Sequence, residues 1–349
     1  MAENKPSSTS SSEPAGSLEP AGPRWPALKL LLRVLVTALE VGALMGLILF
    51  VAPDGNDYAK VTIDKHERLE SAQGSKLVFV GGSNLAYGLD SPSVEKALGH
   101  QVVNMGMNAY LGARFLLEEV AGSLKAGDTV VLSFENEMFR VQSEFDAVDG
   151  RGTDIFMMVK TRPASWRFLP SGLQRQVLAA APEALQRKTL RMLGDLAHWG
   201  REPKLLDRIE TRAGFNSHGD LVSHVGVAWS EPLDAGTNLA ACPLDPRIPV
   251  LLREFRTRLE KRQVRVFLLP PPIPRGYYNA QQTAVEATKR ELDRSVPGLR
   301  IAEPERYVFA ESCFFDDIHH LTGECRLDRT RLVIEDLRTA LGATTRPTH

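Results

Sequence analysis

The chain of 349 residues has 42 Lys and Arg against 43 Asp and Glu, and its net charge of −1 argues against a basic nucleic-acid-binding protein. Its three cysteines are too few for a scaffold built from disulfides, and without a C-x-x-C pair they do not predict a structural zinc. We therefore expect no metal, no other cofactor and no nucleic acid, and the length fits one large domain with attachments.

A long apolar stretch lies near the N-terminus. Residues 34–52 contain one charged side chain, Glu40, and at about 1.5 Å per residue they would extend about 28 Å as a helix. That length is enough to cross the hydrocarbon core of a bilayer. The stretch starts far into the chain and ends without an A-x-A-like cleavage signal. It therefore predicts an uncleaved transmembrane signal anchor over residues 25–53, with membrane contact through residues 28–52.

The polar segments on either side of the apolar stretch give it a direction. Residues 1–24 are rich in Ser, Pro, Ala and Glu, which predicts a disordered tail, and the polar residues 54–75 predict a stalk or a short helix. Three basic residues precede the span and two acidic residues follow it: Arg24, Lys29 and Arg33, then Asp54 and Asp57. The positive-inside rule predicts a single-pass protein with a cytoplasmic N-terminus and a main domain that is periplasmic or extracellular.

Strand and helix patterns alternate through residues 76–345. Short apolar runs bounded by turn residues predict strands over 76–80, 101–107, 128–134, 264–272 and 298–304. Capped or amphipathic segments predict helices over 91–99, 109–124, 246–262 and 326–341. This order predicts an α/β domain with a doubly wound, flavodoxin-like parallel sheet of about five strands. A mostly helical insertion at about 140–235 interrupts the alternation and is expected to form a lid.

Reactive side chains follow several of the predicted strands. Ser83 follows the first strand in "KLVFVGGSN", and Gly106 ends the second. The third strand ends in "ENE", residues 135–137, and the loop "FFDDIHHLTGE" at 314–324 lies just before the last helix. Because ligands of open parallel sheets bind beyond the carboxyl ends of the strands, these segments are expected to meet in one crevice.

The residue types in this crevice suit acyl transfer. A serine hydroxyl needs an imidazole to take its proton, and the imidazole needs a carboxylate to orient it. The spacing D-x-x-H favours Asp317 and His320 for these roles, with His320 ahead of His319, and Asp316 as the substitute if the turn differs by one residue. Ser83 is then the expected nucleophile.

The transition state of acyl transfer also needs donors for its oxyanion. The glycine before Ser83 lets the backbone turn so that the Ser83 amide faces the crevice, and Gly106 can present a second amide. Asn136 is either a third donor or a plain turn residue. Asn84, Asn108, Asn216 and Asp220 are the expected substrate-binding residues.

These blocks resemble the SGNH/GDSL hydrolase superfamily, over roughly residues 75–140 and 260–341. The likeness is greatest to its membrane-anchored, extracytoplasmic branch, which includes proteins that add or remove O-acyl groups on cell-surface polysaccharides. Two positions depart from the family pattern. Gly82 stands where the GDS motif has Asp, and "SFENE" offers Asn136 without the glycine of the usual G-x-N-D.

The resemblance implies a nucleophile at Ser83, a general base at His320 and an orienting acid at Asp317. The amides of Ser83 and Gly106 would form the oxyanion hole. The expected function is a serine esterase or O-acyltransferase that acts on acyl esters, such as acetyl esters, of cell-surface polysaccharide. The alternative is a catalytically silent SGNH-like protein that binds glycan or scaffolds envelope protein partners.

Three further patterns leave alternatives open. The loop 215–224 contacts substrate or is a polar surface loop, and its His and Asp residues make an unconvincing metal site. Glu135 and Glu137 have the spacing of a carboxylate pair, but nothing else indicates a glycosidase. Cys313 and Cys325 flank the D-x-x-H loop and either form a disulfide or remain, with Cys242, as buried thiols.

Overall fold

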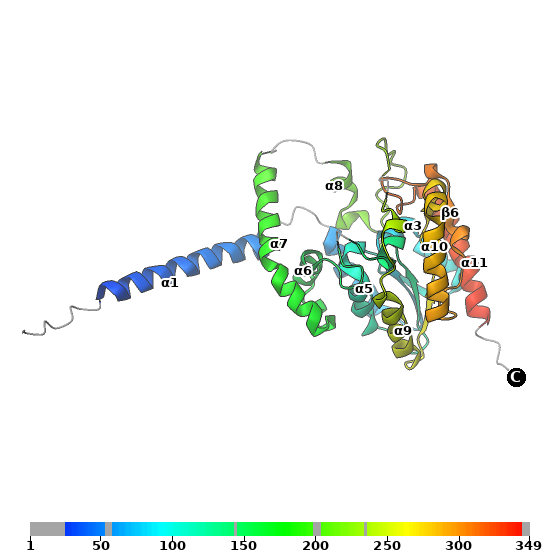
Figure 1. Ribbon diagram of the computed structural model, residues 1–349, viewed down its shortest axis with the longest axis horizontal. Coiled ribbons are helices and arrows are strands. Elements are labelled where there is room, and N and C mark those ends of the chain that lie inside the picture. Colours follow the sequence, from blue (N-terminus) through cyan, green and yellow to red (C-terminus); the bar gives the residue numbers. More distant parts are fainter. Residues whose placement is uncertain (1–24, 53–57, 143–144, 198–203, 234–235, 344–349) are drawn as a thin grey trace, which may run out of the picture. The chain divides into compact units, whose positions relative to one another are not determined.

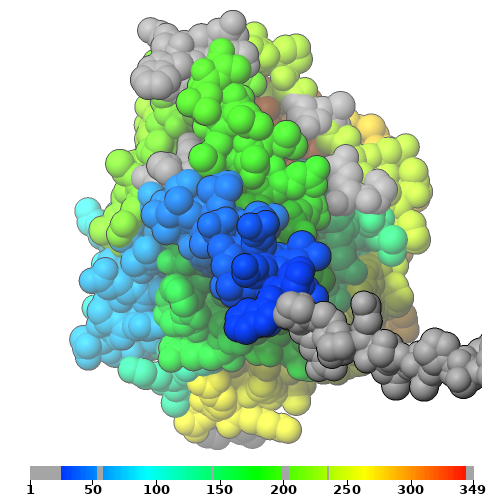
Figure 2. All heavy atoms as spheres, turned by 90° about the vertical axis from the view of Figure 1, so that its left-hand side faces the viewer, coloured from blue at the N-terminus to red at the C-terminus, as the bar shows by residue number. Residues whose placement is uncertain are grey.

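The computed structural model describes residues 25–52, 58–142, 145–197, 204–233 and 236–343, so the expected tail at 1–24 lies outside the described residues. The chain divides into two compact units, residues 1–51 and 52–349. The first unit contains one continuous helix, Trp25–Val51, which is long and apolar enough to cross a membrane. Its first and longer part is α1 (Trp25–Gly46), whose large apolar side chains are exposed (blue in Figure 2).

The second unit is built on a parallel sheet of four strands in the order β2-β1-β3-β4. The strands are β1 (Lys76–Gly81), β2 (Gln101–Asn104), β3 (Thr129–Ser133) and β4 (Arg265–Leu268). The predicted α/β class and parallel pairing are thus confirmed. The fifth predicted strand, at 298–304, contributes a single bridge between Arg300 and Leu268, and the described sheet has four strands.

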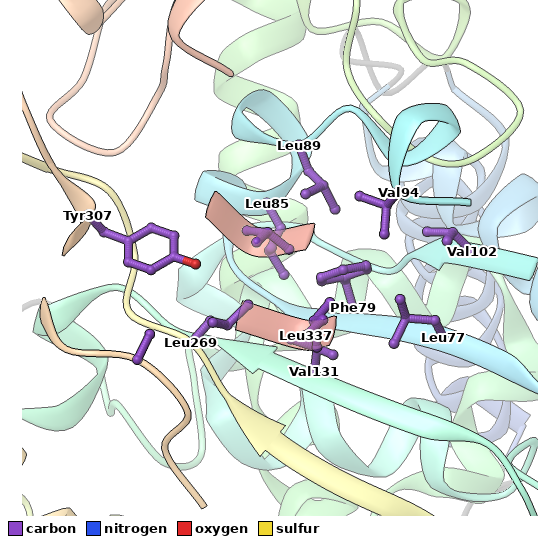
Figure 3. Packing of buried hydrophobic residues seen from close by; sticks show 12 residues of the cluster. Leu77, Phe79, Leu85, Leu89, Val94, Val102, Val131, Leu269, Tyr307 and Leu337 are labelled. Atoms are coloured by element: carbon purple, nitrogen blue, oxygen red, sulfur yellow. The ribbon is translucent and has the colours of Figure 1, made fainter. Parts of the chain in front are cut away.

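Helices cover the sheet because the central strand is apolar on both faces. Every residue of β1 is buried, as expected for a strand inside a parallel sheet. Leu77 and Phe79 point to one face, where they pack with Leu337 of α11 (Gly323–Ala343) and with Val94 of α4 (Ser91–Leu98) (Figure 3). On the other side of the strands, α5 (Gly112–Ala121) contacts β1 and α9 (Arg247–Glu260) contacts β4 (Figure 1).

Part of the segment expected to form a stalk or a short helix is a helix that packs onto the domain. Residues 61–71 form α2 (Val61–Ser71), in which Val61, Lys65 and Leu69 recur every fourth residue and are all buried. This spacing places them on one face of the helix. The described part of the segment is therefore a short helix, and its buried face includes the charged residue Lys65, so no apolar stripe marked it in the sequence.

The predicted insertion between β3 and β4 is helical. It contains α6 (Gly152–Thr161), α7 (Ser171–Ala197) and the short α8 (Leu205–Ile209), and α6 packs against α7. After β4 the chain forms α10 (Arg275–Ser295) and a small parallel sheet of β5 (Ile273–Pro274) and β6 (Val308–Phe309). The sequence patterns had not indicated α10 or this second sheet.

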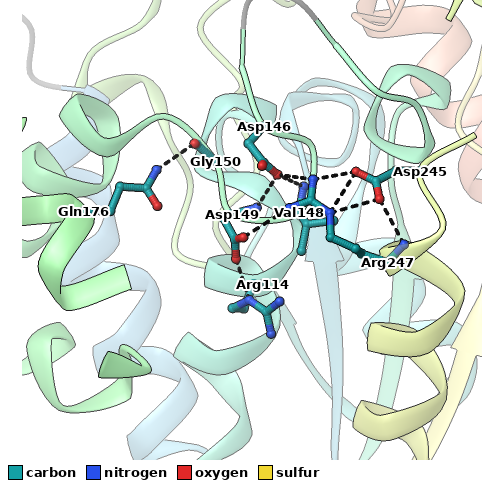
Figure 4. Close-up of polar contacts among 8 residues, drawn as sticks. All are labelled: Arg114, Asp146, Val148, Asp149, Gly150, Gln176, Asp245 and Arg247. Atoms are coloured by element: carbon teal, nitrogen blue, oxygen red, sulfur yellow. Dashed lines mark hydrogen bonds and ion pairs between the residues drawn. The ribbon is translucent and has the colours of Figure 1, made fainter. Parts of the chain in front are cut away.

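A charged cluster fixes the loop that enters the insertion (Figure 4). Asp146 accepts hydrogen bonds from the backbone N–H groups of residues 148 and 149, each at 2.9 Å, and pairs with Arg247 at 2.9 Å. Asp149 pairs with Arg114 of α5 at 2.6 Å. These contacts tie the start of the insertion to the helices beside the sheet, and Phe145, which lines the cleft described below, directly precedes them.

Two leucines of α11 allow a test of this packing. Leu337 is fully buried and Leu327 is 50% exposed. Leu337→Ala should lower the free energy of unfolding by about 2–5 kcal/mol because it leaves a cavity against β1. Leu327→Ala should change the same quantity by less than about 0.5 kcal/mol. Urea unfolding of the detergent-solubilised protein, followed by circular dichroism, measures both, and equal losses would show that α11 does not pack on the sheet as described.

Candidate active site

Ser83 lies at the carboxyl end of the central strand. It is the first residue of α3 (Ser83–Gly88) and follows Gly81, which ends β1, and Gly82, which is the N-cap of α3. A Cβ atom on Gly81 would overlap the carbonyl oxygen of Ser133, and one on Gly82 would overlap the carboxylate of Glu135. Gly81 is therefore required by the close approach of the β3 backbone, whereas Gly82 meets only the end of the flexible Glu135 side chain.

The serine, an imidazole and a carboxylate form a hydrogen-bonded line. Ser83 Oγ lies 2.8 Å from His320 Nε2, and His320 Nδ1 lies 2.8 Å from Asp316 Oδ1. The carboxylate on the imidazole is thus that of Asp316, and the contact expected from Asp317 is not the one formed. Asp317 Oδ1 instead accepts a hydrogen bond of 2.8 Å from the backbone N–H of His319. The turn is shifted by one residue because Asp317 caps it.

Two further groups set the orientation and charge of His320. The ring of Tyr87, one turn along α3 from Ser83, stacks on the imidazole with 3.8 Å between centroids and 4° between planes. Burial alone would lower the pKa of His320, but the hydrogen bond that its ring donates to Asp316 and the charges of Asp316 and Asp317 outweigh it and raise the pKa. The imidazole is therefore a stronger base than a free histidine, and its ring plane is held by stacking.

Buried polar groups anchor the helix that carries Ser83. Asn84 is 0% exposed, and its backbone N–H donates to Glu135 Oε1 at 3.0 Å. Its side chain donates to the carbonyl oxygen of Ser133 at 2.9 Å. Arg329 of α11 donates to the carbonyl and the side-chain oxygen of Asn84, at 2.6 and 2.8 Å. Asn84 therefore positions its neighbour and is not placed to bind substrate as expected.

Two of the expected oxyanion donors are directed elsewhere. The backbone N–H of Gly106 donates to Asn104 Oδ1 at 2.9 Å, and the Gly106 carbonyl accepts from the buried Lys65 Nζ at 2.5 Å. Asn136 is buried and lines a different cavity, beside Leu268. The Gly106 N–H is therefore occupied, whereas Asn136 lines another cavity and its Nδ2 has no hydrogen-bond partner among the described residues.

Asn216 and Asp220 belong to a hydrogen-bond network that holds a loop in place, and they do not line the cleft. Asp220 is 0% exposed and accepts hydrogen bonds from the side chains of Ser91, Asn104 and Asn216, at 2.5, 2.8 and 3.0 Å. This network fixes the loop 215–224 to the end of β2. Within the described ranges, no group of three or more His, Cys, Asp or Glu side chains is arranged to hold a metal ion.

A cleft of about 590 Å³ opens over Ser83. It is lined by Ser83, His320 and Asp317 together with Asn108, Glu135 and Glu210. Of the expected substrate-binding residues, the cleft lining contains Asn108 but not Asn84, Asn216 or Asp220. Glu210 comes from the insertion and accepts a hydrogen bond of 2.9 Å from Tyr87 Oη. No motif in the sequence had indicated that Glu210 or Tyr87 belongs to the site.

A second imidazole–carboxylate pair lies in the same cleft. His319 Nε2 is 2.9 Å from Glu137 Oε2, and Glu137 Oε1 accepts a hydrogen bond of 2.8 Å from Tyr277. Burial opposes the charged form of His319, but the Glu137 carboxylate outweighs it and raises the pKa to about 10. Burial alone would raise the pKa of Glu137, but the His319 charge outweighs it and holds the pKa below its usual value. Glu137 is thus committed to an ion pair, which argues against its pairing with Glu135 as in a glycosidase.

A disulfide closes the loop that carries these groups. Cys313 and Cys325 are bonded, with Cα atoms 5.4 Å apart and a sequence separation of 12. The loop contains Asp316 and His320, so the bridge limits the separation of its two ends. Cys242 is a free thiol and lines the cleft.

Comparison with known proteins adds no identification. No protein-family model matches the chain, and no curated protein is significantly similar to it.

The Glu137–His319 pair predicts a stability that depends on pH. A pKa of about 10 in the folded protein, against 6.5 for an ordinary histidine, gives stability that is complete below pH 6.5 and is lost as the pH rises through 10. The free energy of unfolding should therefore fall by a few kcal/mol, on the order of 1.4 per pH unit, between these values. Urea unfolding of the wild type at pH 6, 8 and 10 measures it.

His319→Gln supplies the matched control. The variant cannot take the charge, so its unfolding free energy should be lower at pH 6 and should lack this part of the pH dependence. A wild type and a variant with the same slope between pH 6.5 and 10 would show that the pair is not ionised in the folded protein.

Proposed function

We propose that the protein is a membrane-anchored serine esterase or O-acyltransferase of the SGNH type, with a doubly wound domain over residues 76–345. The observation that supports this most strongly is the line of hydrogen bonds from Ser83 Oγ through His320 to Asp316, with 2.8 Å at both steps. An activated serine hydroxyl needs an imidazole within this distance, and the imidazole needs a carboxylate on its other nitrogen.

The proposed reaction proceeds through an acyl-enzyme. Ser83 Oγ attacks the carbonyl carbon of an ester while His320 Nε2 takes the hydroxyl proton. Asp316 holds the Nδ1 proton and stabilises the imidazolium. The C–O bond of the ester then breaks, and His320 returns the proton to the leaving alcohol. Water or the hydroxyl group of a second substrate then attacks the acyl-enzyme while His320 takes its proton. The ester bond to Ser83 Oγ breaks, His320 returns the proton to Ser83, and the acyl group leaves on the attacking oxygen.

The oxyanion keeps one donor expected from the family, the Ser83 amide, and requires a second donor in place of Gly106. The N–H of Ser83 is at the first residue of α3, where helix donors make no bond within the helix. We assign the second donor to the side-chain amide of Asn108, which lines the cleft with Ser83. Its oxygen accepts from the backbone N–H of Tyr110 at 2.9 Å, so its NH₂ group is directed away from that bond.

We propose that the domain lies outside the cytoplasm and acts on acyl esters, such as acetyl esters, of cell-surface polysaccharide. The apolar helix Trp25–Val51 would anchor it, with the N-terminus in the cytoplasm. The Cys313–Cys325 disulfide supports this location, since disulfides persist in oxidising compartments and are rare in the cytosol.

A second candidate function has one observation in its favour. The Gly106 amide is bonded to Asn104, and Asn136 lines another cavity, so two donors of the family's oxyanion hole are lost. A protein that has kept the fold but lost the esterase activity would be expected to lack these donors. In that case the domain would bind glycan or hold envelope proteins together.

Ser83 labelling distinguishes the two candidates. A fluorophosphonate probe should label the wild-type protein at Ser83, because the probe reports a hydroxyl activated by an imidazole. Ser83→Ala should not be labelled, and its circular dichroism should match that of the wild type. Labelling is read from a fluorescent gel and located by peptide mass spectrometry. A folded wild-type protein that takes up no probe would favour the silent scaffold.

Two adjacent aspartates test the assignment of the orienting acid. Asp316→Asn should lower kcat/KM for a neutral ester such as p-nitrophenyl acetate by about 10²–10⁴-fold, because it removes the carboxylate from His320 Nδ1. Asp317→Asn should lower it by less than about tenfold, since Asp317 caps the backbone at His319. The reverse order of the two losses would return the orienting role to Asp317.

A further inference from the structure

The charge of the cleft narrows the class of ester that fits it, on the assumption that Ser83 has the proposed function. Four carboxylate side chains line the cleft, and no Lys or Arg does so among the described residues: the four are Glu135, Glu137, Glu210 and Asp317. Asp316 adds a fifth negative charge behind His320. The cations of the lining are limited to the two imidazoles, so carboxylates outnumber them even when both are protonated.

Pairing neutralises some of these carboxylates and leaves others. Glu137 is paired with His319 at 2.9 Å, and Asp316 with His320 at 2.8 Å. Glu210 accepts from a phenol, the hydroxyl of Tyr87, which brings no charge. Asp317 accepts from a backbone N–H, and its nearest cations are the imidazoles already paired. Among the described residues, neither Glu210 nor Asp317 therefore has a cationic partner of its own.

The buried guanidinium groups do not cancel this charge at the cleft surface. Arg329 is 1% exposed and donates to Asn84 and Ser133. Arg140 is 6% exposed and donates to the carbonyl of Cys242. Both lie behind the lining and neither belongs to it. A bound ester would thus meet the carboxylates first.

Glu135 supplies an independent sign of a missing donor. It is 2% exposed and lines the cleft next to Ser83. Its Oε1 accepts from Asn84, but its Oε2 has no hydrogen-bond partner among the residues that the structure describes. A buried carboxylate oxygen without a donor is costly, and a ligand that carries an N–H donor would satisfy it.

We propose that the cleft selects esters whose alcohol part carries a protonated amine, such as an amino sugar or a small amino alcohol. Glu135, Glu210 and Asp317 are the acceptors for that amine. Aromatic side chains from Tyr58, Tyr110 and Phe145 line the same cleft and suit an ammonium group, although Arg151 already stacks on the Tyr110 ring at 4.2 Å. Esters with a carboxylate near the scissile bond are excluded by repulsion.

The pKa of Glu210 agrees with a preference for esters that carry an ammonium group. Burial raises its pKa, and the nearby carboxylates of Asp316 and Asp207 raise it further, against the hydrogen bond from Tyr87 and the charge of His320. A cation bound beside it would favour the ionised form and lower the pKa. Binding of an ammonium ester therefore stabilises a charge that the empty cleft disfavours.

Three acetate esters with the same heavy-atom skeleton test the proposal on the full-length protein. They are 2-(dimethylamino)ethyl acetate, which is cationic, 3-methylbutyl acetate, which is neutral, and 3-acetoxypropanoate, which is anionic. The expected kcat/KM for the cationic ester exceeds that for the neutral one by about tenfold at low salt, and the anionic ester is the poorest. The ratio should shrink at high ionic strength, because part of the attraction is screened.

Variants are compared by the same ratio within each protein, so that a general loss of activity cancels. Glu210→Gln and Asp317→Asn should each reduce the cationic-to-neutral ratio by about threefold or more. Glu254→Gln, which changes an exposed carboxylate of α9 that is not part of the cleft lining, should leave the ratio unchanged. If turnover is slow, protection of Ser83 from the fluorophosphonate by each ester gives the same comparison.

The outcomes separate the inference from the function on which it rests. A labelled Ser83 with equal kcat/KM, or equal protection, for the cationic and neutral esters overturns the selection and keeps the enzyme. An unchanged ratio in both cleft variants also overturns it. If Ser83 is not labelled and none of the three esters reacts, the proposed function fails and the inference fails with it.

Discussion

The candidate site depends on one buried contact between the last helix and the end of the central strand. The Arg329 guanidinium donates to the carbonyl and the side chain of Asn84, and the Asn84 amide is bonded to Glu135. All three residues are almost without solvent exposure, so each donor or acceptor would be left unsatisfied if another were removed. These hydrogen bonds hold Asn84, and with it the preceding residue Ser83, against two strands and α11.

The same helix α11 also holds the loop that carries His320, the second half of the candidate site. The disulfide joins Cys325, in its first turn, to Cys313 before the loop, and the loop carries Asp316 and His320 between them. Tyr87 then links both halves, because it belongs to the short helix of Ser83 and stacks on the ring of His320. The alignment of serine and imidazole is therefore a consequence of how one helix packs.

Much of the sheet was predictable because its signals are local. Buried parallel strands are continuous apolar runs, and the runs ending at Gly81 and Ser133 were placed to within about two residues. The long α10 was missed since its apolar stripe is diluted by charged residues on the other faces. The helix α2 was expected only as the alternative to a stalk, because its buried face includes the charged Lys65. The last expected strand was reduced to one bridge at Arg300, which no local pattern could reveal.

By itself the sequence determined that an apolar span precedes an α/β domain, and that a serine, histidines and aspartates follow elements that meet at one edge. Only the tertiary structure decided that Asp316 and not Asp317 bonds the imidazole, and that Gly106 and Asn136 turn away from Ser83. The physical reason is that adjacent groups in a turn, such as Asp316 and Asp317, compete for the same hydrogen-bond donor. Side chains from distant segments of the chain decide which of them forms the bond, and the periodicity of the sequence carries no information about those side chains.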